Sequence, residues 1–249
     1  MAKKILALAF LFFPLLLPAQ SIKDTTLQLH MFSFHVSSHL PTGDIASRYG
    51  FNMGVGGSYW FKTNSNWLLA ADFTYIFGNK FKEDSILNGL RDKDGYLITT
   101  YGEQMFPTIS ERGFYGGLRV GKLFPVIGPN PNSGLVITAS AGLLQYKTFF
   151  RLEENSIPVI MDDYVKLLDY LTNGFALNQF IGYLHLDSEQ PINFYAGFEF
   201  HQAWTMGRRD WLYNLHGPEN KLRHDFLFGI RLGWIFPVGK KATGTYTYF

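Results

Sequence analysis

The chain has 249 residues, with 22 Lys and Arg, 20 Asp and Glu, and no Cys. This length suits one large domain or two small ones, and an all-β barrel of this size commonly forms a single domain. The nearly balanced charge gives no support to nucleic-acid binding, and the lack of Cys excludes disulfide staples in an exported protein.

Residues 1–20 predict a cleaved secretory signal peptide. Lys3 and Lys4 precede the apolar segment 5–17, which is too short to span a bilayer comfortably. Removing these two Lys residues leaves 20 basic and 20 acidic residues in the mature chain. No Cys follows the cleavage region, so the protein is not expected to be a lipoprotein. No later apolar run approaches 18 residues, so no transmembrane helix is expected.

Eight later segments predict β-strands, because apolar residues alternate in them with small or polar ones. These segments are 27–37, 51–61, 67–77, 114–124, 135–149, 175–186, 192–204 and 226–237. The first segment changes parity near Met31, where a β-bulge is expected. The fifth ends out of phase, and the parity of the sixth is ambiguous. The eighth, FLFGIRLGWIFP, alternates most clearly.

The connections between these segments alternate in length. Residues 38–50, 78–113, 151–174 and 205–224 form long connections, whereas 62–66, 125–134 and 187–191 form shorter ones. This alternation is typical of bacterial barrels with long extracellular loops and short periplasmic turns. In the third long connection, apolar residues at helical spacing predict one short helix over Asp162–Thr172. It is expected to rest as a cap on the barrel rim, and the alternative is a helix that docks a partner.

The bulky faces of the strands are expected to point outward into lipid. The interior of an eight-stranded barrel is only just wide enough for side chains, so it cannot house all the Phe, Tyr, Trp, Leu and Ile. Aromatic residues near the short turns predict an interfacial girdle; they are Trp60, Trp67, Phe124, Phe194, Trp234 and Phe236. The fold class is therefore an all-β, eight-stranded antiparallel up-and-down transmembrane β-barrel. A soluble two-sheet sandwich that buries the bulky faces is the alternative.

Four charged residues belong to the predicted inward set. Asp72 and Arg119 are each five residues from a short turn, on strands that are neighbours. Glu199 and Arg231 come from another neighbouring pair, at similar depth. Isolated charges inside a barrel would be costly, so these four residues are expected to pair. The structural interpretation is a plug that closes the lumen, and the functional alternative is a gate or polar relay.

Other motifs give weaker signals. His35-x-Ser37 resembles the His-x-Ser pair that some lipid A deacylases carry on the outer barrel surface, so His35 and Ser37 are a weak catalytic candidate. Arg208 and Arg209 are candidates for contact with lipopolysaccharide phosphates, or are solvated loop charges. Asp92-x-Asp94-Gly95 lacks the later Glu of a calcium loop and predicts a β-turn. No metal or cofactor is expected.

Several stretches carry a family resemblance. They are the leader end Pro18-Ala19-Gln20, Pro41–Asp44, Asn130–Gly134 and Gly229–Pro237, together with the eight-strand layout. The chain resembles the small outer-membrane barrel proteins of Bacteroidetes, in the PorT-like grouping of the OmpA/OmpX-like superfamily. The resemblance implies an eight-stranded barrel in the outer membrane. An association with type IX secretion follows from it by analogy alone.

The sequence thus predicts a signal peptide over 1–20, a barrel over 21–238 and a short periplasmic tail over 239–249, with Phe236 closing the last strand. The alternative is that Phe249 serves as the terminal aromatic signal for assembly. The expected function is non-enzymatic, with extracellular loops that bind a surface or secretion protein. The expected partners are outer-membrane lipid, lipopolysaccharide and, during biogenesis, the barrel-assembly machinery. The alternatives are a lipid-modifying barrel enzyme and a soluble exported β-protein.

Overall fold

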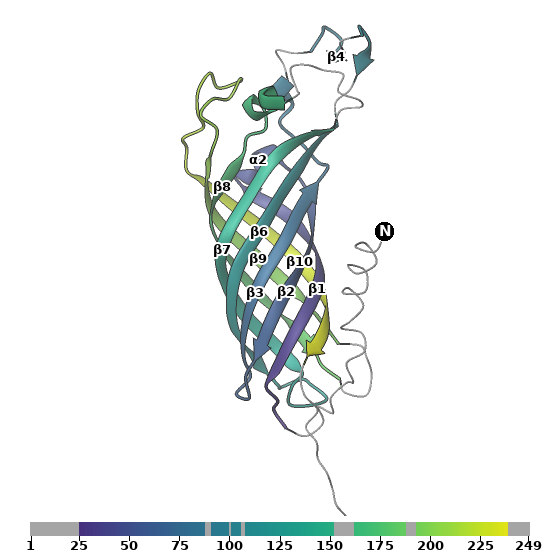
Figure 1. Ribbon diagram of the computed structural model, residues 1–249, viewed down its shortest axis with the longest axis vertical. Helices are drawn as coiled ribbons and strands as arrows, with labels where there is room; N and C mark the ends of the chain where they lie inside the picture. Colours follow the sequence, from purple (N-terminus) through teal and green to yellow (C-terminus); the bar gives the residue numbers. More distant parts are fainter. Residues whose placement is uncertain are drawn as a thin grey trace, which may run out of the picture.

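A computed structural model describes residues 25–87, 91–99, 101–105, 108–151, 162–187 and 193–238. Eight long strands form one barrel (Figure 1). They are β1 (Leu29–Gly43), β2 (Asn52–Lys62), β3 (Trp67–Gly78), β6 (Thr108–Phe124), β7 (Gly134–Arg151), β8 (Thr172–His185), β9 (Phe194–Gly207) and β10 (Arg223–Val238). The predicted signal peptide and C-terminal tail lie outside the described residues.

The barrel is closed, and every neighbouring pair of its strands is antiparallel. The strand order is β1-β10-β9-β8-β7-β6-β3-β2, and β2 pairs with β1 to complete the ring. The predicted eight-stranded antiparallel barrel is therefore confirmed, and the two-sheet sandwich is excluded. The short turns and the two ends of the barrel segment lie at one end of the cylinder, and the long connections lie at the other (Figure 1). We call these the short-turn end and the long-loop end.

The bulge expected near Met31 is absent, and that prediction is wrong. β1 keeps a single register along its whole length with both neighbours. Leu29 and Met31 point inward, as do Ser33 and His35 after them. The sequence pattern changes parity because the barrel interior changes from apolar to polar along the strand, while the backbone continues without interruption.

The same reason explains the fifth and sixth segments. β7 keeps one register with both neighbours, so the apparent loss of phase is also wrong. Its inward positions become large and apolar toward the long-loop end, at Leu144, Tyr146 and Phe150. In β8, Ala176, Asn178 and Phe180 point inward, which resolves the ambiguous parity. Large inward side chains fit in the small interior because a residue beside them is often glycine. Tyr195 in β9 is an example: a Cβ at Gly233 would lie 2.1 Å from its ring.

The prediction that Trp60 belongs to the outward aromatic girdle is wrong. It is 5% exposed and packs in the interior, where its indole N–H donates a hydrogen bond to Ser33. The remaining five girdle residues are outward and exposed, as predicted. Trp60 follows Tyr59 in the chain, so it falls on the inward face even though its size suggests the opposite.

The long connections contain more structure than expected. The predicted helix over Asp162–Thr172 is a 3-10 helix over Asp162–Leu167, and β8 already begins at Thr172. An α-helix, α2 (Ile45–Arg48), a 3-10 helix over Asp84–Leu87 and a two-stranded sheet of β4 (Leu97–Ile98) and β5 (Gln104–Met105) were not predicted. Asp92 forms the expected turn, because its carboxylate accepts the N–H groups of Asp94 and Tyr96.

The outer wall of the barrel is apolar. Its most exposed bulky side chains include Phe34, Phe73, Leu118, Phe175, Phe198, Leu232 and Trp234. Charged side chains are scarce on this wall. Such a surface is stable only against hydrocarbon, so the barrel is of the transmembrane type. Among the described residues, no helix combines the length and the hydrophobicity needed to cross a membrane.

Candidate functional site

The short-turn end of the interior is filled by an apolar cluster. Its members come from all eight strands of the barrel; they include Leu29, Met31, Trp60, Leu68, Leu123, Val136, Phe180, Leu184, Tyr195 and Ile235. Below this cluster the ammonium of Lys62 donates to Asn132 at 2.8 Å and to the Leu27 carbonyl at 3.0 Å. Because each strand contributes an inward side chain to this cluster, the cluster closes the short-turn end of the barrel interior.

Above the apolar cluster, the structure brings the four predicted charges together. We call Asp72, Arg119, Glu199 and Arg231 the interior charge layer. Arg119 Nε lies 2.6 Å from Asp72, and Ser58 also donates a hydrogen bond to this carboxylate. The other two guanidinium nitrogens of Arg119 donate to Thr138 and Asn178, at 2.7 and 2.9 Å. Every donor group of Arg119 therefore has a partner.

Arg231 joins the two halves of the interior charge layer. Its Nη2 lies 2.8 Å from Glu199 Oε2, and its Nη1 lies 3.5 Å from Asp72 Oδ2. Arg231 is 1% exposed, and the other three residues are also buried. Two carboxylates and two guanidiniums cancel in charge, which limits the large cost of holding four ions away from water.

Two histidines extend this layer toward the long-loop end, and the sequence interpretation did not identify them. His39 Nε2 lies 2.8 Å from Glu199 Oε1, and its Nδ1 lies 2.9 Å from Asn52 Oδ1. The Asn52 amide is oriented by its second contact, a donated hydrogen bond to Glu111 at 2.9 Å. His39 Nδ1 is therefore a donor. His201 Nε2 receives a hydrogen bond from Asn178 at 2.8 Å.

His39, Glu199 and His201 have the donor types of a divalent-metal site. One ligand atom from each lies within 4.8 Å of the others, which is the one such group among the described residues. However, Glu199 already contacts the Arg231 guanidinium, and Asn178 donates to both Glu199 and His201. A cation would have to displace these contacts. The hydrogen-bond network therefore accounts for the three residues without a metal.

His35 and Ser37 do not form a surface catalytic pair. Both point into the closed interior and are almost completely buried, so the expected place on the outer surface is wrong. His35 Nε2 contacts Thr74 Oγ1 at 2.9 Å, while His35 Nδ1 and the Ser37 hydroxyl have no hydrogen-bond partner. A nucleophilic hydroxyl needs a base within hydrogen-bond distance and access to substrate. Neither condition is met.

At the long-loop end, the described parts of the connections 44–51, 79–107, 152–171 and 208–222 pack together, and we call this assembly the loop platform. Arg48 in α2 is 3% exposed and lies at its centre. Its guanidinium contacts Glu83 at 2.7 Å and Glu219 at 3.1 Å, and it lies 4.1 Å from the centre of the Tyr170 ring. One side chain therefore connects all four loops.

A separate apolar cluster supports the loop platform from within. Its buried members are Ile86, Leu87, Leu97, Phe150, Leu168, Tyr170 and Leu212. Burial raises the pKa of the Tyr170 hydroxyl, which keeps it neutral beside Arg48. Asp44 ties the platform to β10, because it accepts the His224 N–H at 2.8 Å, and this bond lowers the pKa of Asp44. The loops therefore pack against one another as one layer and do not extend separately from the barrel.

The loop platform leaves large apolar side chains exposed. Trp211 is 50% exposed, and Tyr213 and Leu215 beside it are also exposed. Ile98 in β4 and Tyr101 in the turn between β4 and β5 are exposed as well. Sequence interpretation missed these residues because no periodic pattern marks a loop. An available signal was the run Trp211-Leu212-Tyr213, which is unusually apolar for a segment outside the strands.

Arg208 and Arg209 lie on this platform but have different surroundings. Arg209 forms an ion pair with the buried Asp169 at 2.5 Å, and this hydrogen bond raises the pKa of Arg209. Arg208 is exposed and donates to the Asn173 side chain. Arg209 therefore has a structural partner, whereas Arg208 remains accessible to an external anion.

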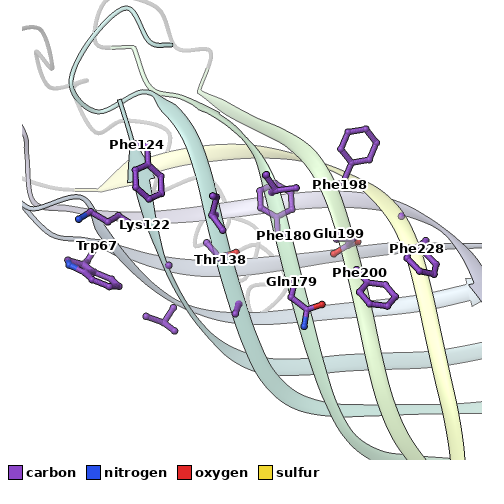
Figure 2. Close-up of a pocket in the computed structure, with 16 residues that line it drawn as sticks. Trp67, Lys122, Phe124, Thr138, Gln179, Phe180, Phe198, Glu199, Phe200 and Phe228 are labelled. Atoms are coloured by element: carbon purple, nitrogen blue, oxygen red, sulfur yellow. The ribbon is translucent and has the colours of Figure 1, made fainter. Parts of the chain in front are cut away.

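The outer wall carries a groove of about 690 Å³ that crosses β6, β7, β8 and β9 (Figure 2). It is lined mainly by apolar side chains, and its residues include Trp67, Val120, Lys122, Ala139, Gln179, Phe198, Phe200 and Phe228. Ala139 forms a low point between larger neighbours. Gln179 and Lys122 are the polar side chains that point to this face.

Comparisons with known proteins give structural similarity alone. No protein-family model matches the chain, and no curated protein sequence matches it. Among solved structures, Neisserial surface protein A is 10% identical, with 84% of this chain and 96% of that chain covered and a TM-score of 0.43. Ail, the attachment invasion locus protein of Yersinia pestis, is 9% identical, with 84% and 99% covered and a TM-score of 0.45. The outer membrane protein OprG from Pseudomonas aeruginosa is 10% identical, with 89% and 100% covered and a TM-score of 0.38.

Proposed function

We propose that this protein is an integral outer-membrane β-barrel without enzymatic activity, and that its loop platform binds a protein at the cell surface or in a secretion system. The signal peptide over 1–20 would export the chain, and the barrel-assembly machinery would insert it. Because the interior is filled by side chains, the loops would be the part of the protein that binds the partner. A PorT-like role in type IX secretion is the specific form suggested by the family resemblance.

The observation that carries this proposal is the exposure of Trp211 and Tyr213 on a platform that is otherwise well packed. Trp, Tyr and Arg are the residues that most often dominate protein interfaces. Arg48 and the buried apolar cluster hold these aromatics in place before any partner arrives. A preformed surface loses less conformational entropy on binding, which favours a protein partner over a passive role.

The direction of the barrel supports the same proposal. Bacterial barrels place long loops outside the cell and short turns in the periplasm. The loop platform would then face the medium, where Arg208 could also contact lipopolysaccharide phosphates. The lipid-modifying alternative receives no support from His35 and Ser37, because both are enclosed by the barrel wall.

The test is site-specific crosslinking on intact cells. Wild-type protein should capture a discrete partner, and Trp211→Ala should lower the captured amount by roughly tenfold or more, as expected for a central aromatic at an interface. Trp234→Ala removes the same side chain from the lipid-facing wall and serves as the matched control. Equal capture by both variants would refute the docking surface.

Membrane location is tested separately by carbonate extraction of the same cells. The wild type and both variants should remain in the membrane pellet and should be cleaved by external protease within the loops. A protein released by carbonate would refute the outer-membrane proposal, independently of any partner.

A further inference from the structure

The groove on the outer wall rises from the short-turn end to the middle of the barrel. Its lowest lining residues, Trp67 and Lys122, lie at the first position of β3 and two residues before the end of β6. Across the register, Lys122 pairs with Ile137, Ile137 with Ile181, and Ile181 with Phe198.

The row moves away from the short-turn end between β6 and β8, because the strands are staggered around the barrel: Lys122 is two residues from that end of its strand, and Ile181 is four. Ile137 is three residues above the start of β7, and Phe198 is four above the start of β9. Phe228 at the far end of the groove is ten residues above the end of β10. The groove therefore runs obliquely from the short-turn ends of β3 and β6 to the middle part of β10.

The positively charged side chain of Lys122 lies at the short-turn end of this groove. The ammonium of Lys122 lies 5.4 Å from the centre of the Trp67 ring and has no ion pair within the described ranges. Lys and Trp near a strand end are typical of the level of the lipid headgroups. An uncompensated ammonium at that level attracts anionic headgroups.

The floor of the groove is low at Ala139, which is smaller than its register neighbours, and the next outward residue of β7, Ala141, is small too. Val120 and Gln179 are the register neighbours of Ala139 on β6 and β8, and the aromatic ring of Phe200 forms the next wall (Figure 2). A flexible hydrocarbon chain makes more contacts in an apolar groove of this shape than on the flat wall that an ordinary boundary lipid would meet.

We propose that this groove binds one anionic glycerophospholipid, with its phosphate against Lys122 and an acyl chain lying over Ala139 toward Phe228. The site rests on the proposed outer-membrane location, and its lipid comes from the leaflet at the short-turn end. Lys122 selects the headgroup charge, and the groove retains the chain.

The side-chain amide of Gln179 points to the same face, and it makes no hydrogen bond with the part of the chain that the structure describes (Figure 2). It lies too far from the strand end to contact a headgroup. Gln179→Leu should therefore leave headgroup selection unchanged, which separates the role of Lys122 from general polarity on this wall.

The experiment is native mass spectrometry of the full chain released from mild detergent with equal amounts of phosphatidylglycerol and phosphatidylethanolamine. Folding is first verified for every variant by its electrophoretic mobility with and without boiling. The wild type should retain phosphatidylglycerol preferentially. Lys122→Gln should lower this preference about fivefold, which is the effect of one basic residue at an anionic membrane surface.

Two matched controls accompany these variants. Lys147→Gln removes an outward Lys from β7 near the long-loop end, and it should keep the preference for phosphatidylglycerol. Ala139→Phe fills the floor of the groove and should reduce retention of both lipids, whereas Ala141→Phe, one outward position along the same strand, should not.

Equal losses in Lys122→Gln and Lys147→Gln would overturn the proposal in favour of diffuse charge attraction. Wild-type retention in Ala139→Phe would overturn it in favour of ordinary boundary lipid. If the wild type fails the mobility test and inserts into no bilayer, the outer-membrane proposal itself is wrong, which is a result distinct from either of these.

Discussion

The barrel body and the loop platform each contain a buried arginine that contacts two carboxylates, and the comparison shows how differently the same chemistry is used. Arg231 contacts Asp72 and Glu199, which lie on strands already fixed by backbone hydrogen bonds. Arg48 contacts Glu83 and Glu219, which lie on loops with few backbone bonds between them. Arg231 balances charge inside a barrel that is closed by its strand pairing, whereas Arg48 holds the loops that carry Glu83 and Glu219 against each other.

This difference predicts that loss of Arg231 destabilises the whole barrel. Arg231→Met leaves Glu199 and Asp72 short of a positive partner in a closed interior, so the free energy of unfolding should fall by about 3–5 kcal/mol. The double variant Arg231→Met with Glu199→Gln removes one of the stranded charges and should be more stable than the single variant. Urea unfolding in lipid vesicles measures both. Costs that simply add would contradict the pairing.

A second prediction concerns the outer surfaces of the two regions. Phe73→Arg places a cation midway along the lipid-facing wall and should lower the free energy of unfolding by about 2–4 kcal/mol. Trp211→Arg makes the same kind of change on the loop platform, which faces water, and should stay within about 0.5 kcal/mol of the wild type. Equal effects in vesicle unfolding would show that the wall does not face hydrocarbon.

A third prediction concerns Arg48. Arg48→Met should leave the barrel midpoint in urea nearly unchanged, while opening of the loop platform becomes easier by about 1–3 kcal/mol because Glu83 and Glu219 lose their shared donor. Protease cleavage within the loops should then accelerate roughly tenfold or more. Arg208→Met, which removes an exposed arginine from the same platform, is the control and should cleave at the wild-type rate.

The smallest expected effect separates the two adjacent arginines of the fourth long loop. Arg209→Gln leaves the buried Asp169 with a weaker partner and should cost about 1 kcal/mol of local stability. Arg208→Gln should change stability by less than about 0.5 kcal/mol. Hydrogen exchange of the loop amides measures this difference. A larger effect from Arg208 would mean that its contact with Asn173 has structural importance.

The sequence predicted the barrel well because strand pairing imposes a period of two on every residue. Asp72, Arg119, Glu199 and Arg231 could be brought to one depth by counting from the short turns, since the register is regular. Trp60 was misplaced because its size suggested the lipid face, whereas its position in the alternation decided the matter. The parity change near Met31 reflects a change of the interior from apolar to polar, and the one in β7 reflects a change from polar back to apolar.

The loop platform could not be predicted in the same way. Arg48, Glu83 and Glu219 are far apart in sequence, and no repeating geometry relates one loop to the next. His39 and His201 were missed for a related reason. Both lie on inward rows, but the sequence alone does not show which side chains of other strands an imidazole ring contacts.

The pairing of β1 with β10 has a consequence for biogenesis. The first pair of this ladder is His30 with Val238, so the ring is completed by the last of its eight strands to be synthesised. Until then, β1 and β9 would each present a row of unsatisfied amides, which hydrocarbon does not tolerate. Stepwise insertion from the N-terminus is therefore unfavourable, and truncation within β10 should leave an open sheet that proteases degrade.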